Sequence, residues 1–217
     1  MVRFLKYRNG LSSRGYISGV NTIKYLWAGI FFIVLIWSGI DPKDQITWLL
    51  EILPALIGAA LLVTTYRSFK LTSIVYLMIL AHCIVLMIGG HYTYAEVPFF
   101  DGLFGAERNN YDKLGHFFQG FVPALIAREI LIRKHVVNGR WWLSLFVICV
   151  ALSFSAFYEL IEWWVAVISG GGAEAFLGTQ GYIWDTQSDM AFALVGAISS
   201  LVFLSKFHDK QIKNVVG

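Results

Sequence analysis

Residues 141–169 read WWLSLFVICVALSFSAFYELIEWWVAVIS, and this stretch decides the fold. A helix of this length rises about 43 Å, at about 1.5 Å per residue, whereas the hydrocarbon core of a bilayer is about 30 Å thick. Glu159 and Glu162 are the only charged residues in the stretch. The sequence therefore predicts a transmembrane helix that is long enough to tilt and that carries two carboxylates.

Five further apolar segments accompany this stretch. They run over residues 25–40, 46–66, 71–90, 113–132 and 186–205. The chain is 57% hydrophobic and 14% charged, whereas a soluble domain has about 25% charged residues. These features predict an all-α membrane protein, a six-transmembrane-helix bundle that forms a single domain over residues 25–205. Residues 1–24 are expected to form a basic N-terminal arm, and residues 206–217 a basic tail.

The distribution of Lys and Arg predicts the orientation of the bundle. Fourteen of the 17 basic residues fall in the N-terminal arm, in or next to the second and fourth connections, or in the tail. Lys43, Arg108 and Lys113 fall on the other side. By the positive-inside rule both termini are expected in the cytoplasm. The net charge of +3 thus indicates contact with anionic membrane lipids, and we expect no nucleic-acid partner.

Ionisable residues recur in pairs near the predicted outer ends of three segments. The pairs are Asp112 with His116, Glu159 with Glu162, and Asp185 with Asp189. A spacing of three or four residues places both members on one helical face. Such two-residue forks on facing helices hold metal ions in helical bundles. All six residues are therefore candidate ligands of a divalent metal ion, and Zn, Mn, Mg and Ca are all compatible with these donors.

Each part of this metal hypothesis has a structural alternative. Asp is a favoured N-cap, so Asp112 and Asp185 suit helix capping equally well. His116 also suits a hydrogen-bonded core histidine. Glu159 and Glu162 lie well inside a hydrophobic run, where a carboxylate without a partner is costly, so a partner is required for both.

Four further ionisable residues lie inside the apolar segments but away from this polar layer. Glu51 and His82 are isolated in other apolar segments, where a core role is the simpler interpretation for His82. Arg128 and Glu129 lie near the predicted cytoplasmic end, and we expect the arginine to extend toward the lipid headgroups.

Two predicted outer connections, 91–111 and 170–184, are rich in aromatic residues and glycine. Such a composition is typical of segments that lie in the membrane interface or re-enter the bundle, where backbone must be covered by protein or line a wet cavity. Polar and aromatic residues in and beside these connections are candidate substrate-binding residues: His91, Tyr158, Trp163, Gln180, Trp184 and Gln187. The aromatic members also suit an interfacial aromatic belt.

Three motifs together resemble a known family. They are Asp112-Lys113-x-x-His116-x-x-Gln119-Gly120, Tyr158-Glu159-x-x-Glu162-Trp163, and Gly178-Thr179-Gln180-Gly181-x-x-Trp184-Asp185-Thr186-Gln187-x-Asp189-Met190. Over roughly residues 20–205 the chain resembles the YjdF-like family of bacterial inner-membrane proteins, and more distantly it is similar to the VanZ-like membrane proteins. The family often has Asp after the Gln-Gly pair, where this chain has Tyr182. The resemblance implies a multi-pass protein of the bacterial inner membrane and supplies neither a reaction nor a substrate.

Three functional hypotheses follow from the polar layer. In the first, the protein is a hydrolase or transferase for a lipid or lipid-linked envelope substrate, with Glu159 or His116 as general base or acid. In the second, it is a small proton- or cation-coupled transporter or flippase, which requires a polar path to the cytoplasmic side. In the third, it is a non-catalytic membrane binding protein whose polar layer fixes helix packing.

Overall fold

The computed structural model describes residues 13–102, 108–169, 176 and 179–216. This part of the chain is helical apart from turns and one isolated β-bridge between Asp101 and Asn109. The elements are α1 (Ser13–Ser38), α2 (Gln45–Thr65), α3 (Ser73–His91), α4 (Tyr111–Arg133), α5 (Arg140–Ser169), α7 (Asp185–Ser199), the π-helix η2 (Ser200–Leu204) and α8 (Ser205–Val216).

The all-helical prediction is confirmed, and the predicted segments for α2 to α5 end within two residues of the observed helices. Four helices of the described chain are long and apolar enough to cross a membrane: α2, α3, α5 and the continuous helix Asp185–Val215. The apolar part of α1 is shorter, at Lys24–Ser38. Helix α4 carries charged residues near both ends, and Asp112, Lys113, Arg128 and Glu129 among them are buried.

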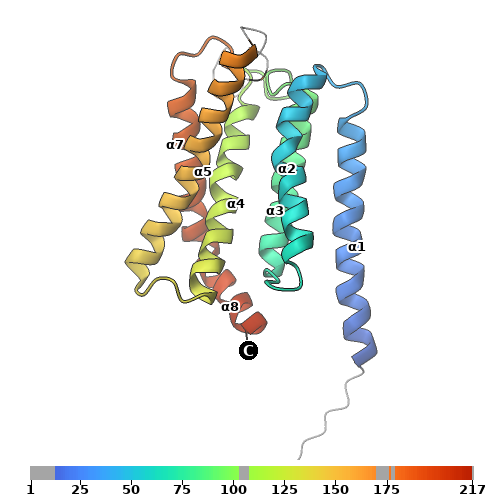
Figure 1. Ribbon diagram of the computed structural model, residues 1–217, viewed down its shortest axis with the longest axis vertical. Helices are drawn as coiled ribbons and strands as arrows, with labels where there is room; N and C mark the ends of the chain where they lie inside the picture. Colours follow the sequence, from blue (N-terminus) through green and yellow to red (C-terminus); the bar gives the residue numbers. More distant parts are fainter. Residues whose placement is uncertain (1–12, 103–107, 170–175, 177–178, 217) are drawn as a thin grey trace, which may run out of the picture.

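The helices run alongside one another, with α1 at one edge and α5 and α7 at the other (Figure 1). Helix α4 is the centre of the bundle and packs against α3, α5 and α7, while α3 also packs against α1 and α2. We call the end where α2, α4 and α7 begin the site end, and the opposite end, which holds α8, the tail end. The start of α1 also lies at the tail end (Figure 1).

Two glycines allow α4 and α7 to approach closely. A Cβ on Gly120 of α4 would collide with the backbone of Ala193, and one on Gly196 of α7 would collide with the backbone carbonyl of Phe117. Small residues at a helix interface are the usual means by which membrane helices reach short interaxial distances. This contact brings the first turns of α4 and α7, with their charged residues, together at the site end.

The connection after α3 folds back over the site end, as the aromatic content of this segment predicted. Tyr94 and Val97 are buried and pack with Tyr111 and Val85. The Tyr94 ring lies directly over Gly89 and Gly115, where larger residues would clash with it. Most of the other aromatic connection lies outside the described residues, and its Phe176 is buried against the bundle.

Candidate functional site

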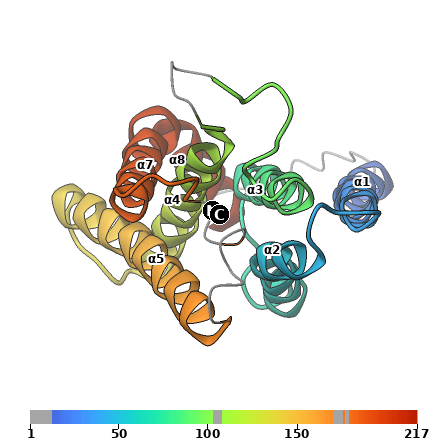
Figure 2. The same cartoon turned by 90° about the horizontal axis from the view of Figure 1, so that it is seen from above.

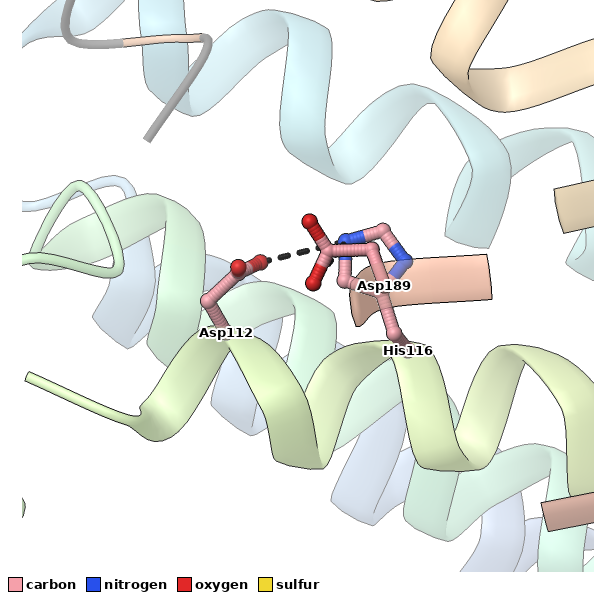
Figure 3. Close-up of side chains that lie close together, drawn as sticks. All are labelled: Asp112, His116 and Asp189. Atoms are coloured by element: carbon pink, nitrogen blue, oxygen red, sulfur yellow. Dashed lines mark ion pairs between the residues drawn. The ribbon is translucent and has the colours of Figure 1, made fainter. Parts of the chain in front are cut away.

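The first turns of α4 place Asp112 and His116 one above the other. The His116 Nε2 lies 3.2 Å from Asp112 Oδ1, and its Nδ1 lies 2.8 Å from Gln119 Oε1. Asp189 of α7 approaches the same imidazole, with Oδ1 3.8 Å from Nε2. Figure 3 shows the three side chains lying close together beside the first turns of α4. One ligand atom from each of Asp112, His116 and Asp189 lies within 4.8 Å of the others, so these three could hold a metal ion.

Lys113 lies among three aspartates. Its ammonium is 2.5 Å from Asp189, 2.8 Å from Asp185 and 3.3 Å from Asp112. Arg108 adds a second cation, 2.6 Å from Asp185 and 3.5 Å from Asp112. All five residues are largely buried, and buried charges persist only when they are paired. Arg108 and Lys113 were predicted only to lie on the outer side of the membrane. Their place in the site was not predicted.

Helix α5 contributes two carboxylates to the same region. Glu159 Oε1 lies 3.8 Å from His116 Nδ1, and it has no hydrogen-bond partner among the residues that the structure describes. Glu162 lines a cavity next to Asp112 and His116. Both glutamates are buried, with 9% of their surface exposed. The prediction that their i, i+3 spacing turns both inward therefore agrees with the structure.

A sixth carboxylate comes from α2. Glu51 is 4% exposed and accepts a hydrogen bond of 3.1 Å from the Tyr158 hydroxyl of α5. The interpretation of Glu51 as an isolated charge outside the polar layer is therefore wrong. The available signal was its position as the single charged residue in the helix 45–65, where a carboxylate requires a partner.

Three of the six carboxylates, from Glu51, Asp112 and Glu162, line a small cavity between α2, α3, α4 and α5. Leu86, Tyr94 and Phe176 form much of its apolar wall. Its polar lining residues are Glu51, Asp112, His116, Gln119, Tyr158 and Glu162. The space open to the centre of a water molecule is about 20 Å³, which is enough for one or two waters or a single ion.

The charge of the whole cluster is strongly negative. Six buried carboxylates face two permanent cations, Arg108 and Lys113, together with the imidazole of His116. Carboxylates that are buried without enough cations must bind protons or an added cation. The arrangement therefore suits a cation-binding centre, and its oxygen and imidazole donors fit a divalent metal.

The predicted substrate-binding residues lie in different parts of the structure, and only some of them are near the cavity. Tyr158 lines the cavity. Gln180 is exposed, but its amide bonds both backbone groups of Asn109, at 2.9 and 3.0 Å, and so fixes the chain beside Arg108. His91 lies elsewhere, because its Nδ1 bonds the Ser38 carbonyl at 3.0 Å and its ring packs on Trp37 at the end of α1.

Trp163, Trp184 and Gln187 are exposed in the structure. Gln187 lies two residues from both Asp185 and Asp189, and a turn of about 100° per residue places it on the opposite face of α7. The prediction that these three side chains line the site with the carboxylates is therefore not supported by the geometry.

His82 differs from its predicted role as a satisfied core histidine. Its ring packs on Phe118 at 6.2 Å, and its buried Nε2 has no hydrogen-bond partner among the described residues. Glu129 also differs from expectation, because it belongs to a second buried cluster at the tail end.

In this tail-end cluster, Glu129 is fully buried and accepts hydrogen bonds from the backbone and hydroxyl of Thr72 at the start of α3. Arg133 lies 2.6 Å from the same carboxylate, and the His208 imidazole of α8 lies 3.0 Å from it. Arg128 is also buried, against His208 and Asp209, so the expectation that it reaches the headgroups is wrong. These ion pairs and hydrogen bonds thus connect α8 with α3 and α4.

The helices and the two buried clusters define a polytopic α-helical membrane protein with an acidic centre at one end of its bundle. The family model described as "Predicted membrane protein (DUF2238)" matches residues 23–210, and the chain belongs to this family. It is 53% identical to the inner membrane protein YjdF of Escherichia coli (strain K12) over 184 residues, which cover 83% of this chain and 88% of that protein. No solved structure matches the chain. These relationships support a multi-pass location in the inner membrane.

Proposed function

We propose that this protein binds a divalent cation at the site end, on the extracytoplasmic side of the inner membrane, and acts there as a hydrolase or transferase on a lipid or lipid-linked envelope substrate. Asp112, His116 and Asp189 supply the central donors, Glu159 adds a carboxylate from α5, and Glu162 lines the adjoining cavity. Asp185 is the peripheral member, because Arg108 and Lys113 already neutralise it. The observation that carries the proposal is the excess of buried carboxylates over cations around the group Asp112, His116 and Asp189, beside a cavity of ionic size.

Glu159 has the most suitable position for proton transfer. Its Oε1 has no hydrogen-bond partner among the described residues and lies 3.8 Å from His116 Nδ1, so it can accept a proton next to the bound ion. The Tyr158 hydroxyl, one residue earlier, is held by Glu51 at the opposite wall of the cavity. A bound metal ion would supply Lewis acidity toward a phosphoryl or acyl oxygen.

Metal analysis of the purified full chain tests this proposal first. After chelation and dialysis, Mn²⁺, Zn²⁺, Mg²⁺ or Ca²⁺ is titrated back and binding is measured by calorimetry. We expect one or two ions per chain for at least one of these metals. His116→Ala and Glu159→Gln should each raise Kd by more than the about 10–100-fold that loss of an outer-shell partner costs.

Glu96→Gln is the matched control for the binding experiment. Glu96 is an acidic residue at the same end of the bundle, but it is 56% exposed and pairs with the exposed Lys43. This variant should bind metal like the parent chain. Equal, weak binding by all variants, or no stoichiometric ion, would contradict the proposal.

One observation favours transport as a second candidate. Helix α4 carries an acidic and histidine cluster at each end, and the tail-end cluster includes the fully buried Glu129 and His208. Proteoliposomes loaded with a pH-sensitive dye distinguish the two functions, because only a transporter gives a proton or cation flux that both Glu159→Gln and Glu129→Gln abolish.

A further inference from the structure

The wall of the cavity between α2 and α5 differs from its other walls. Helix α2 packs against α3, and α5 packs against α4 and α7, whereas α2 and α5 have no extensive contact within the described chain. Seen from above, the two ribbons stand apart at the site end (Figure 2). The Glu51–Tyr158 hydrogen bond bridges them at the level of the cavity. Among the described residues, the two helices thus meet at the cavity through a hydrogen bond and without extensive packing.

The turn of α2 that follows Glu51 lacks one helical hydrogen bond. Pro54 lies inside α2, three residues after Glu51, and it cannot donate the backbone hydrogen bond that would close the turn at Leu50. A proline within a helix is a common origin of kinks and local bending. The missing hydrogen bond weakens α2 close to Glu51, in a part of the helix that contacts α3 at Gly90 and α1 at Ser38.

The surfaces beside this contact are apolar and open to lipid. Ile57 of α2 is 52% exposed, and Phe154 and Phe157 of α5 are 58% and 53% exposed. An acyl chain can lie against such surfaces, whereas the polar groups of the cavity can receive a headgroup. The present cavity has space only for water or an ion, so a headgroup enters only when the Glu51–Tyr158 contact opens.

The charges of the cavity select the kind of headgroup. Neither Glu51 nor Glu162 forms an ion pair with a cationic side chain in the part of the chain that the structure describes. An ammonium group complements these two carboxylates directly. The phosphate of the same lipid would then lie toward the proposed cation.

We infer that α2 and α5 form a lateral gate, held shut by the Glu51–Tyr158 hydrogen bond, through which a phospholipid with an ammonium headgroup enters the site from the surrounding leaflet. This inference deepens the proposed function and rests on it for the reaction, but the gate itself requires neither metal nor catalysis.

Photocrosslinking of the full chain in nanodiscs tests the gate. The photoreactive residue p-benzoylphenylalanine replaces Phe176, which lines the cavity and is 4% exposed. Phe31 is the matched control, since it is 2% exposed but lies in the core between α1 and α3. Phe203, which is 75% exposed, reports general contact with lipid. Intact-mass spectrometry counts the lipid adducts in nanodiscs of phosphatidylethanolamine or phosphatidylglycerol, each with and without EDTA.

Two variants change the gate in opposite directions. Tyr158→Phe removes the hydrogen bond and should raise the Phe176 adduct yield about fivefold, the change expected for loss of one such bond. Pro54→Ala restores the missing helical hydrogen bond outside the cavity and should lower the yield. The adduct should form with phosphatidylethanolamine in preference to phosphatidylglycerol and should persist in EDTA.

Adducts at Phe203 without adducts at Phe176 would overturn the gate, as would a Phe176 yield that neither variant changes. Equal yields from both lipids would overturn the ammonium assignment. Because the readout persists without metal, a chain that takes up lipid but binds no cation would contradict the proposed function and leave the gate standing.

Discussion

At the scale of single residues, the site depends on Lys113. Its ammonium neutralises aspartates from two helices, and it is the residue that joins the first turn of α4 to the first turns of α7. A buried ion pair adds little net stability, but removal of one member leaves a charge that is both buried and unpaired. The lysine is therefore structural as well as electrostatic, because it holds Asp189 next to His116.

Lys113→Met should destabilise the protein by about 3–5 kcal/mol, because Asp185 and Asp189 lose their shared cation in a buried setting. Chemical or thermal unfolding in detergent measures the loss. Lys43→Met is the control, and it should change stability by at most about 1 kcal/mol, because the Lys43–Glu96 pair is exposed.

A second substitution distinguishes the effect of the Lys113 charge from the effect of its side-chain packing. If the cost arises from an unpaired carboxylate, Asp189→Asn should recover part of the stability lost in Lys113→Met, so the two changes are not additive. Additive losses would show that the lysine stem, rather than its charge, stabilises the contact.

At the scale of elements, the closest packing in the bundle is between α4 and α7. Gly120 and Gly196 are placed where the backbones of the two helices meet, and Ala124, Ala193 and Ala197 around them are fully buried. The geometry of the metal-ligand candidates depends on this contact, since Asp112 and His116 are on one helix and Asp189 is on the other.

Gly120→Ala should lower stability by about 1–3 kcal/mol, because the added methyl group meets the carbonyl of Ala193 and forces the helices apart. Gly58→Ala in α2 is a matched change with nothing within 4 Å of the new Cβ. That control should be neutral, or stabilising by up to about 1 kcal/mol, because alanine is the better helix former. Equal effects of the two variants would show that α4 and α7 do not require a glycine.

Helix α8 is a second element whose position depends on buried charge. Glu129 accepts from Thr72 of α3 and pairs with His208 of α8, and the Gln211 side chain of α8 accepts a 3.0 Å hydrogen bond from the backbone of Ile74. The last helix thus helps to satisfy the backbone donors at the start of α3, which the helix itself leaves unpaired.

Glu129→Gln should release α8, because His208 and Arg133 lose their carboxylate. Hydrogen–deuterium exchange should then accelerate in α8 by about tenfold or more, in keeping with the loss of a charged hydrogen bond. Asp209→Asn is the control, since Asp209 is 49% exposed and its pair with Arg128 contributes less. Unchanged exchange in Glu129→Gln would mean that apolar contacts such as Ile212 hold the helix.

At the scale of the whole molecule, the bundle has unequal halves. Helices α2, α3, α4, α5 and α7 all contribute to the site, whereas α1 packs mainly on α3, with Trp27 bonding the Tyr76 carbonyl at 2.9 Å. The start of α1 and helix α8 lie at the same end of the bundle (Figure 1), which agrees with the predicted even number of membrane crossings. The orientation of that end in the membrane stays a prediction of the charge distribution.

Cysteine labelling in intact cells measures this orientation. In a Cys83→Ala, Cys149→Ala background, Glu96→Cys at the site end should react with an impermeant maleimide added outside. Asn138→Cys and Lys213→Cys should react only after the membrane is permeabilised, because basic connections remain in the cytoplasm. The reverse pattern would place the acidic centre on the cytoplasmic side.

The sequence by itself determined the helices and the inward direction of the paired acids. In lipid, backbone groups must bond within their own helix, so apolar runs reveal their ends locally, and a spacing of three or four residues fixes which side chains share a face. The segments for α2 to α5, and the pairs Asp112–His116 and Glu159–Glu162, follow from such local rules.

Only the tertiary structure decided which partner each buried charge has. Glu51 meets Tyr158 across 107 residues, Lys113 meets Asp189 across 76, and Glu129 meets His208 across 79. No periodicity within one helix encodes these pairs, because they depend on how α2, α4, α5, α7 and α8 pack. The physical reason is that the cost of a buried charge is offset by whichever donor or counter-ion the assembled bundle brings near, and that choice exists only after the helices have met.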